Sequence, residues 1–382
     1  MGKKTHGPPL LVAIQKNDRK KVHDILIQNI HSRNKIHDLL TSDIKHMASE
    51  NVDCPLILAT QLPDPTLICY FINNHGIDVN FVHKRGDGRK QKIITLLIVA
   101  VKRQLYQTVD ELLALRADPD VRNHKGRTAL HYAIMGADYK MAKRLCMKGA
   151  NVNLQDKFED SPVHMAARFG HIELVKLLHQ YGADLYKGGP YGAIPLHIAA
   201  EEGHVGLVRL FVQHDVGVNS KVTCDEEGRE KAPLHIACEQ GHIEEVIVLL
   251  DHLKADMNLQ CSEGETPLHC CVIREYDNFG MKSKDDFAEV ARALIEAGAF
   301  VNSRNGRGET PLHLAARNEF QRVVEILITN GANPLIEDND GNKPIDLVSE
   351  DDGVTKQNLK RAMTEQEAVL SQVLEVQSRG FR

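Results

Sequence analysis

The feature that most constrains this chain is a Leu-His or Val-His step that recurs six times at nearly constant spacing. The copies are Thr-Ala-Leu-His (128–131), Ser-Pro-Val-His (161–164), Ile-Pro-Leu-His (194–197), Ala-Pro-Leu-His (232–235), Thr-Pro-Leu-His (266–269) and Thr-Pro-Leu-His (310–313). Their histidines are 33, 33, 38, 34 and 44 residues apart. A period of this length is typical of stacked repeats. A chain of 382 residues built in this way lengthens by adding units and needs no domain break.

The segment 160–185 predicts the structure of one unit. Ser161 suits a helix N-cap and Pro162 suits the first helical position, because that position needs no backbone N–H donor. The apolar spacing predicts a short helix that ends at Gly170 and a second helix that begins near His171. Gly182 then predicts the second stop, since glycine tolerates the left-handed turn that ends many helices.

This alternation of short helix, turn, longer helix and extended turn resembles the ankyrin repeat. The motifs that carry the resemblance are Thr-Pro-Leu-His-x-Ala, Gly-His and Gly-Ala-x-x-Asn, and full matches cover about 123–345. The resemblance implies an all-α repeat fold, a solenoid of helix-turn-helix units joined by β-hairpin loops. It also implies that partner proteins dock on the concave side, made of hairpin tips and the exposed face of the shorter helices.

The two ends of the chain depart from this template. Residues 1–122 are expected to hold degenerate repeats at 9–13, 55–59 and 95–100, in which Leu11, Ile57 and Leu97 replace the histidine, and an irregular connector at 30–53. The regular repeats follow over 123–345. Residues 346–382 are expected to form a capping unit and a tail helix, because terminal repeats are atypical.

Two repeats carry extra residues. The insertion at 222–231 is expected to lengthen a hairpin loop, and the insertion at 276–286 is expected to separate the two helices of its repeat. Insertions of this kind lie on one face, which is often the binding face. The alternative is that surface loops lengthen at little energetic cost.

Composition limits the class of partner and the cellular compartment that we expect. The formal net charge is −5, which gives no global case for nucleic acid, whose binders usually carry a basic excess. The eight cysteines are scattered and no signal peptide is evident, so we expect free thiols and a cytoplasmic or nuclear protein. The longest apolar run, 93–101, is too short to span a bilayer, and no membrane partner is expected.

No pattern in the sequence predicts catalysis, a cofactor or a metal. Zinc ligands converge on one point, whereas stacked repeats would place the six histidines about 10 Å apart, one in each layer. In ankyrin repeats this histidine usually bonds within its own turn and to neighbouring turns. The chain has no Gly-x-Ser-x-Gly elbow, phosphate-binding loop or His-Glu-x-x-His helix. We therefore expect no enzymatic activity and no cofactor.

The most basic stretch holds five Lys or Arg residues within 84–92. It favours either a contact with phosphate or a nuclear-import signal. The alternative is a solvated hairpin, and no interleaved aromatic residue supports base stacking.

One asparagine is a candidate for modification. Some ankyrin proteins are hydroxylated at the hairpin asparagine by an oxygenase that prefers a Leu eight residues earlier and an acid two residues earlier. Leu250, Asp256 and Asn258 match this preference best. The alternative role for Asn258 is to shape its turn, since Asn tolerates left-handed backbone.

The template places the partner-contacting residues just before the Pro-Leu-His step and just after the Ala-Ala step. These residues are Lys157, Phe158, Asp160, Arg168, Phe169, Tyr191, Glu201, Glu202, Glu239, Arg274 and Arg317. Phe158, Phe169 and Tyr191 are the strongest of them, because the template has polar residues at these positions and exposed aromatics near arginines are typical of interface hot spots. The alternative is that the three rings pack on neighbouring hairpins.

These observations predict a non-enzymatic scaffold that binds another protein, as a monomer or as a subunit of a complex. A competing hypothesis is an adaptor that recruits substrates to a ubiquitin ligase. Such adaptors usually carry a Leu-Pro-rich box at one end, and 354–382 shows none. A structural subunit of a large assembly, and a nucleic-acid or chromatin contact through 84–92, are further hypotheses. Fold-level resemblance does not identify the partner.

Overall fold

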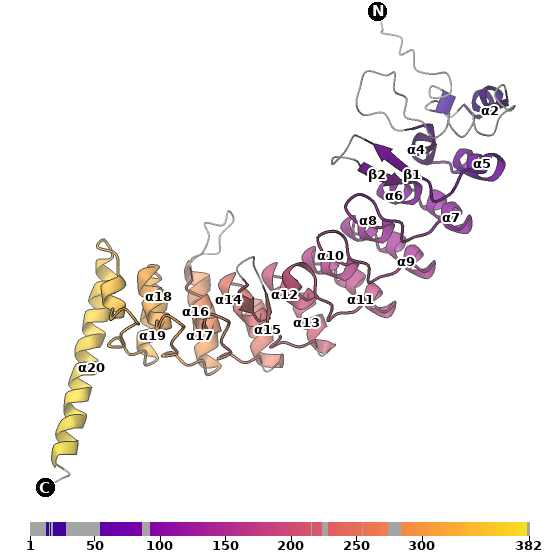
Figure 1. The fold of residues 1–382 in the computed structure, drawn as a ribbon. Helices are drawn as coiled ribbons and strands as arrows, with labels where there is room; N and C mark the ends of the chain where they lie inside the picture. Colours follow the sequence, from indigo (N-terminus) through magenta and orange to yellow (C-terminus); the bar gives the residue numbers. More distant parts are fainter. Residues whose placement is uncertain are drawn as a thin grey trace, which may run out of the picture. The chain divides into compact units, whose positions relative to one another are not determined.

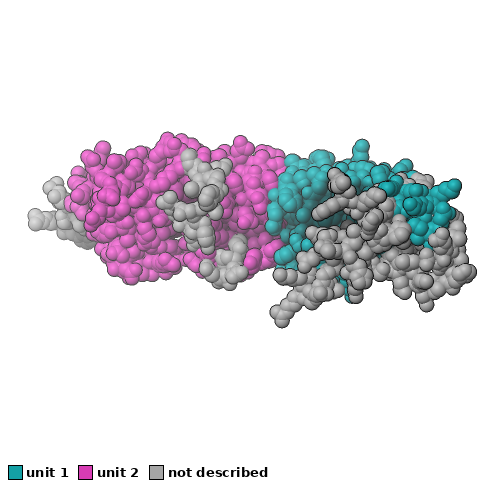
Figure 2. Space-filling model, turned by 90° about the horizontal axis from the view of Figure 1, so that it is seen from above, with its two compact units in different colours: residues 1–184 teal, residues 185–382 magenta. Residues whose placement is uncertain are grey.

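The structure is a computed structural model that falls into two compact units, residues 1–184 and 185–382 (Figure 2). It describes residues 13–14, 16, 18–27, 54–85, 92–214, 216–223, 228–253, 255–273 and 284–379. The expected connector at 30–53 lies outside the described residues, as do residues 9–12 of the first degenerate repeat. Each unit is described below by itself.

Unit 1 is a series of helix pairs with one hairpin. Its elements are α2 (Arg19–Ile27), α4 (Pro55–Thr60), α5 (Thr66–His75), β1 (Val82–Arg85), β2 (Lys92–Thr95), α6 (Leu96–Lys102), α7 (Tyr106–Ala114), α8 (Ala129–Met135), α9 (Tyr139–Met147), α10 (Pro162–Arg168) and α11 (Ile172–Gln180). The first helices α4, α6, α8 and α10 form one row, and α5, α7, α9 and α11 form a second row (Figure 1). We call the surface made by the hairpin tips and the first helices the first-helix side.

The α10–α11 repeat forms as its sequence predicts. Ser161 is the N-cap of α10 with Pro162 at the first helical position, and Gly170 follows the end of α10 with φ +72°. Gly182 stands just beyond α11 with φ +84°. The buried faces are the predicted apolar ones, including Val163 and Ala166 on α10 and Leu178 on α11, each at most 1% exposed. Stacking of these faces supplies the apolar burial that holds such an array together.

Unit 2 repeats the same plan and ends in a long helix. Its elements are η2 (Pro190–Gly192), α12 (Pro195–Glu201), α13 (Val205–Gln213), β3 (Val222–Thr223), β4 (Glu230–Lys231), α14 (Pro233–Glu239), α15 (Ile243–Leu253), α16 (Pro267–Cys270), α17 (Lys284–Glu296), α18 (Pro311–Arg317), α19 (Gln321–Thr329), η3 (Pro344–Leu347) and α20 (Gly353–Arg379). The first helices α12, α14, α16 and α18 pack in sequence, with η3 after α18, and the second helices α13, α15, α17 and α19 pack in sequence behind them.

Helix α20 caps unit 2 with its first turns only. Leu359 and Ala362 are buried where α20 packs on α19 and η3. Val369 and Leu370 are about half exposed, and the helix runs on past the last repeat (Figure 1). Among its described residues, the tail helix therefore covers the array with its N-terminal turns. In the capping unit Asp346 takes the place of the repeat histidine, and its Oδ2 accepts a hydrogen bond from the Lys343 N–H at 2.8 Å.

Both the basic stretch and the first insertion begin and end as antiparallel hairpins. In the basic stretch, Val82 pairs with Thr95 and Arg85 pairs with Lys92. In the first insertion, Val222 pairs with Lys231 and Thr223 pairs with Glu230, which agrees with a lengthened hairpin. Residues 86–91, 224–227 and 274–283 lie outside the described residues, so the second insertion is seen only as the interval between α16 and α17.

Neighbouring hairpin tips touch through their backbones. The Lys157 N–H donates to the Lys125 carbonyl at 2.9 Å, and the Gly306 N–H donates to the Glu263 carbonyl at 2.8 Å. Gly126 has φ +75°, and a Cβ added there would lie 2.8 Å from the Lys157 nitrogen. A side chain at this position would therefore meet both backbone strain and the next hairpin.

Candidate functional site

Five of the six repeated histidines are structural clamps whose Nε2 bonds to a backbone carbonyl beyond their own helix pair, namely His131, His197, His235, His269 and His313. Nδ1 of His131 accepts a hydrogen bond from the Thr128 N–H at 3.1 Å and lies 2.8 Å from the Thr128 hydroxyl, while Nε2 lies 3.3 Å from the Asp160 carbonyl. His269 makes the same contacts with Thr266 and with the Glu309 carbonyl. Because Nδ1 accepts, the ring proton is assigned to Nε2, which donates to the following repeat.

One member of the series is incomplete. His197 keeps the contact from Nε2 to the Ser220 carbonyl at 3.0 Å, but its Nδ1 finds no partner among the described residues. The residue at its N-cap is Ile194, which carries no hydroxyl. The missing hydroxyl alone does not account for this, because Ala232 also lacks one and its N–H still donates to His235 Nδ1 at 3.3 Å.

Burial fixes the charge state of these rings. It lowers the pKa of His131, His197, His235 and His269 to about 4, against an ordinary value of 6.5. Burial also lowers the pKa of His313. Neutral imidazoles that bond to backbone groups confirm the predicted role of this histidine. In the part of the chain that the structure describes, no group of three or more His, Cys, Asp or Glu residues is placed to hold a metal ion.

The hairpin asparagines bond to the next repeat, which the sequence pattern did not predict. Asn153 Oδ1 accepts from the Asp184 N–H and its Nδ2 donates to the Gly182 carbonyl, both at 2.9 Å. Asn258 Oδ1 likewise accepts from the Phe300 N–H at 2.8 Å. The predicted hydroxylation of Asn258 stays a prediction, and mass spectrometry of the chain co-expressed with an asparagine hydroxylase checks it.

The three predicted aromatic residues are all exposed. Phe158 lies on a hairpin tip and Phe169 at the end of α10, 57% and 46% exposed, both on the first-helix side of unit 1. Tyr191 lies in unit 2 on η2, 52% exposed, with φ +55°. The Arg127 guanidinium lies 5.8 Å from the centre of the Phe158 ring, and the Phe169 ring lies 5.9 Å from that of His171. Whether the three rings act together on a partner stays a prediction.

Two of the predicted contact residues are not free surface charges. Asp160 is only 6% exposed, because Arg168 lies over it and donates to its carboxylate at 3.2 Å. Burial raises the pKa of the Asp160 carboxyl, and Arg168 opposes that rise. Glu239 is half-buried and accepts from the buried Lys231 ammonium at 2.7 Å. The expected exposure is therefore wrong for Asp160 and only partial for Glu239, while the partner role of both residues stays a prediction.

A common rule accounts for both corrections. In three regular repeats, the residue before the N-cap pairs with a residue of opposite charge eight positions later, at the end of the first helix. The pairs are Asp160–Arg168, Lys231–Glu239 and Glu309–Arg317. The sequence signal for these pairs is opposite charge at a separation of eight. This signal can be interpreted only once a helix is known to connect the two positions.

The other predicted contact residues are placed as follows. Lys157, Glu201, Glu202 and Arg317 are exposed, and Arg317 pairs with the buried Glu309. Arg274 lies outside the described residues. The partner role of these residues stays a prediction.

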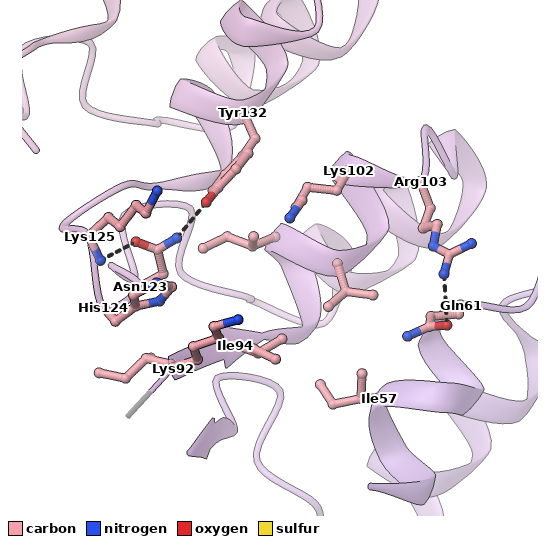
Figure 3. Close-up of a pocket in the computed structure, with 13 residues that line it drawn as sticks. Ile57, Gln61, Lys92, Ile94, Lys102, Arg103, Asn123, His124, Lys125 and Tyr132 are labelled. Atoms are coloured by element: carbon pink, nitrogen blue, oxygen red, sulfur yellow. Dashed lines mark hydrogen bonds between the residues drawn. The ribbon is translucent and has the colours of Figure 1, made fainter. Parts of the chain in front are cut away.

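A pocket on the first-helix side of unit 1 was not predicted. It has a volume of about 490 Å³ and lies where β2, α4, α6 and the hairpin before α8 meet (Figure 3). Its apolar lining comes from Ile57, Ile93, Ile94, Ile98 and Val99, and its basic residues are Lys92, Lys102, Arg103 and Lys125. We call it the basic pocket.

Hydrogen bonds hold one wall of the basic pocket in place. Asn123 donates through Nδ2 to the Tyr132 hydroxyl at 2.7 Å, and its Oδ1 accepts from the Lys125 N–H at 2.9 Å. The Lys102 ammonium lies 4.9 Å from the centre of the Tyr132 ring, a cation–π distance. On the opposite side, Arg103 donates to Gln61 Oε1 at 3.2 Å (Figure 3).

The basic pocket was missed because its residues come from four separate segments. Only Lys92 belongs to the basic stretch that the sequence singles out. The template rule for exposed positions, applied to the degenerate repeat at 95–100, does select Lys102 and Arg103. The pocket itself needs the β1–β2 pairing, which brings Lys92 and Ile94 next to α6.

Comparisons with known proteins agree with this fold. A family model described as ankyrin repeats (3 copies) matches residues 56–156, 136–223, 217–280 and 281–351. The crystal structure of the human ASB11 ankyrin repeat domain superposes with a TM-score of 0.53 and 26% identity, covering 62% of this chain and 98% of that one. No helix in the described part of the chain has the length and apolar character needed to cross a membrane.

Several curated proteins match over a shorter stretch. A protein of Arabidopsis thaliana named "Putative E3 ubiquitin-protein ligase XBAT34" is 40% identical over 83 residues, 21% of each chain. "Ankyrin repeat and SOCS box protein 16" of Mus musculus is 36% identical over 93 residues, 24% of this chain and 20% of that protein. The chain thus spans about a fifth of the length of these relatives. Ankyrin repeats imply protein–protein interaction, and this chain belongs to the ankyrin-repeat family.

Proposed function

We propose that this protein is a non-enzymatic scaffold that binds a partner protein on its first-helix side. The observation that carries the proposal is the exposure of Phe158 and Phe169 on that side of unit 1. Exposed rings near arginines are typical of the anchors that dominate interfaces. Met135 extends the same surface, since it is 39% exposed and its sulfur accepts from Arg127 at 3.5 Å.

The same surface has features suited to protein binding and few that are suited to catalysis. The buried histidines are fully used by backbone partners in most repeats, and the ion pairs at a separation of eight occupy the charges beside them. The accessible features include apolar area, aromatic edges, the cations of the basic pocket and exposed charges such as Lys157. Such a set favours binding energy over bond making.

The test is partner capture by the full chain with and without its rings. Phe158→Ala and Phe169→Ala remove side chains that make few buried contacts, so thermal unfolding should change little while recovery of a cross-linked partner falls. Tyr181→Ala is the matched control, because Tyr181 ends a second helix and is 39% exposed. If Phe169→Ala unfolds the chain, or if Tyr181→Ala reduces capture equally, the aromatic site is wrong.

The second candidate is an adaptor that brings substrates to a ubiquitin ligase. The observation that favours it is the similarity to two relatives, one named a putative E3 ubiquitin-protein ligase and one named an ankyrin repeat and SOCS box protein. In this role the captured partner would be modified and degraded. Expression of the chain should then lower the partner's abundance, and a proteasome inhibitor should restore it. An unchanged half-life of the partner contradicts the adaptor role and leaves the scaffold role standing.

The cytoplasmic or nuclear location, the contact of 84–92 with nucleic acid and the use of α20 in a larger assembly stay predictions. The exposed pair Val369 and Leu370 supports the last of these, because apolar residues on an unpaired helix face often contact another chain. Fluorescence microscopy of the tagged full chain checks the location. Sedimentation of Leu370→Glu beside the natural chain checks the assembly, since a docking helix should lose its larger species.

A further inference from the structure

The basic pocket joins an apolar floor to a cationic rim. The floor includes Ile57, which is fully buried, and Ile98, which is 4% exposed. Lys92, Lys102 and Lys125 lie at its edge, and none of them is buried. Figure 3 shows Lys102 and Lys125 projecting from α6 and from the hairpin before α8, on either side of Tyr132.

No carboxylate compensates these cations among the described residues. The described lining contains no Asp or Glu, and none of its three lysines has an ion pair with a described carboxylate. In regular repeats of both units the pattern is different, because Arg168 and Arg317 pair with acids of their own repeats. Clustered cations over a low-dielectric floor focus a positive potential into the pocket.

The size of the pocket limits what can fill it. A volume of about 490 Å³ matches sites that enclose a small ligand or a few side chains. The apolar floor favours an aliphatic side chain, and the rim favours carboxylates on either side of it. A nucleic acid fits less well, because the Lys102 ammonium already lies over the Tyr132 ring that a base would stack on.

We propose that the basic pocket binds a short acidic segment of the partner protein, with an aliphatic side chain in the floor flanked by Asp or Glu residues. This inference rests on the proposed function and names the chemistry of the partner. The wall formed by Asn123 and Tyr132 is already hydrogen-bonded, so the pocket needs little reorganisation on binding. Preorganisation of this kind lowers the entropic cost of association.

The experiment measures peptide binding directly on the full chain by fluorescence anisotropy. The probe is a fluorescein-labelled peptide of alternating Glu and Leu, compared with a peptide of alternating Gln and Leu and with oligo(dT). The test variant is Lys102→Glu with Lys125→Glu. The matched control is Lys140→Glu with Lys143→Glu, which makes the same charge change at exposed positions of α9 in the second-helix row. Circular dichroism establishes that both variants are folded.

The expected result has three parts. The Glu-Leu peptide binds the natural chain, binding weakens roughly tenfold or more in the pocket variant and stays unchanged in the control, and affinity falls as salt rises. The proposal is overturned if the Gln-Leu peptide binds equally well, if the pocket variant binds like the control, or if oligo(dT) displaces the peptide at lower concentration than an unlabelled copy does.

Failure here can be told apart from failure of the scaffold role. If the peptide does not bind while Phe169→Ala still reduces partner capture, the inference about the basic pocket falls alone. If Phe169→Ala has no effect on capture but the peptide binds through Lys102 and Lys125, the hypothesis of the aromatic site is contradicted and that of the basic pocket is supported.

Discussion

The degenerate repeats of α4–α7 and the regular repeats from α8 onward share a packing plan and differ in their polar parts. In the regular repeats a buried histidine bonds to the next repeat, as His235 does to the Leu259 carbonyl at 2.9 Å. The histidine stands three residues after the N-cap, and in the degenerate repeats this position holds Ile57 and Ile98, which are buried without any polar side-chain group. The expectation that Leu97 takes this position is wrong by one residue, since Thr95 is the N-cap of α6. The apolar stripe alone is therefore sufficient to place a helix pair in the array.

The two regions also differ in how they use surface charge. The regular repeats pair their charges within a repeat, as in Asp160–Arg168. The degenerate repeats leave Lys92 and Lys102 without a described acidic partner at the rim of the basic pocket. The paired charges of the regular repeats are thus occupied within the fold, while the lysines at the rim of the basic pocket have no described acidic partner and can meet a ligand.

The largest expected difference between the two regions is their loss of stability in mild acid. Burial holds the pKa of four clamp histidines at about 4 when folded, below the ordinary 6.5, so the unfolded chain binds more protons between these values. The contribution of these neutral histidines to the free energy of unfolding is complete above pH 6.5 and is lost as the pH falls toward 4. By pH 5 the loss is on the order of 2 kcal/mol per histidine if folding is cooperative.

Hydrogen exchange at pH 7 and pH 5, corrected for intrinsic rates, measures this difference. Amides of α12–α16 should lose protection at the lower pH, while those of α4–α7, which carry no clamp histidine, should keep it. Equal loss in both regions would mean that carboxylates rather than the histidines dominate the acid response.

Core truncation should affect both regions alike. Leu234 follows Pro233 at the start of α14 and is 2% exposed, and Leu56 follows Pro55 in the degenerate α4 and is fully buried. Either substitution to Ala should lower the free energy of unfolding by about 2–5 kcal/mol, since it leaves a cavity. Chemical denaturation measures both. A cost below about 1 kcal/mol for Leu56→Ala would break the claim that the apolar stripe is common to both regions.

Replacing one clamp tests the histidine directly. His235→Leu converts a regular repeat into the degenerate form and should cost about 1–3 kcal/mol, because the Ala232 N–H and the Leu259 carbonyl lose their buried partner. His179→Leu is the control, since His179 is exposed on α11. If His235→Leu raises the melting temperature instead, the clamp is not a source of stability.

The paired charges should give the smallest effect. Arg168→Met removes one partner of the half-buried Asp160 pair and should cost about 1 kcal/mol. Lys176→Met removes an exposed pair with Glu173 and should cost less, about 0.3 kcal/mol. Melting temperatures of the two variants rank them, and the reverse order would contradict the role given to burial.

Local signals in the sequence predicted the helices well. Pro162 and Gly170 bracket α10 as expected, because capping and left-handed turns depend only on neighbouring residues. The predicted role of the repeat histidines was also correct. The family resemblance gave their hydrogen-bond partners, which the spacing of the histidines alone does not give. The strand pair at the ends of 222–231 agrees with the lengthened hairpin expected there, and the strand pair that flanks the basic stretch agrees with the alternative given for 84–92, a hairpin.

Contacts between repeats were harder to predict. Asp160 was expected on the surface, but Arg168 covers it from the far end of α10. The alternative role expected for Asn258 was to shape its own turn, but its Oδ1 also accepts from the Phe300 N–H of the next repeat. The basic pocket gathers Ile57, Lys92 and Lys125 from three segments. Each of these depends on how segments distant in sequence meet in space, which no single window of sequence contains.

The asparagine bridges have a mechanical consequence. Asn302 holds the Asn333 N–H at 2.8 Å and the Gly331 carbonyl at 3.1 Å, and so ties only two adjacent turns together. An array held by such nearest-neighbour bonds resists pulling only at the boundary between one repeat and the next. Under mechanical tension it should therefore unfold from its less stable end, one repeat at a time, while the remaining repeats stay folded.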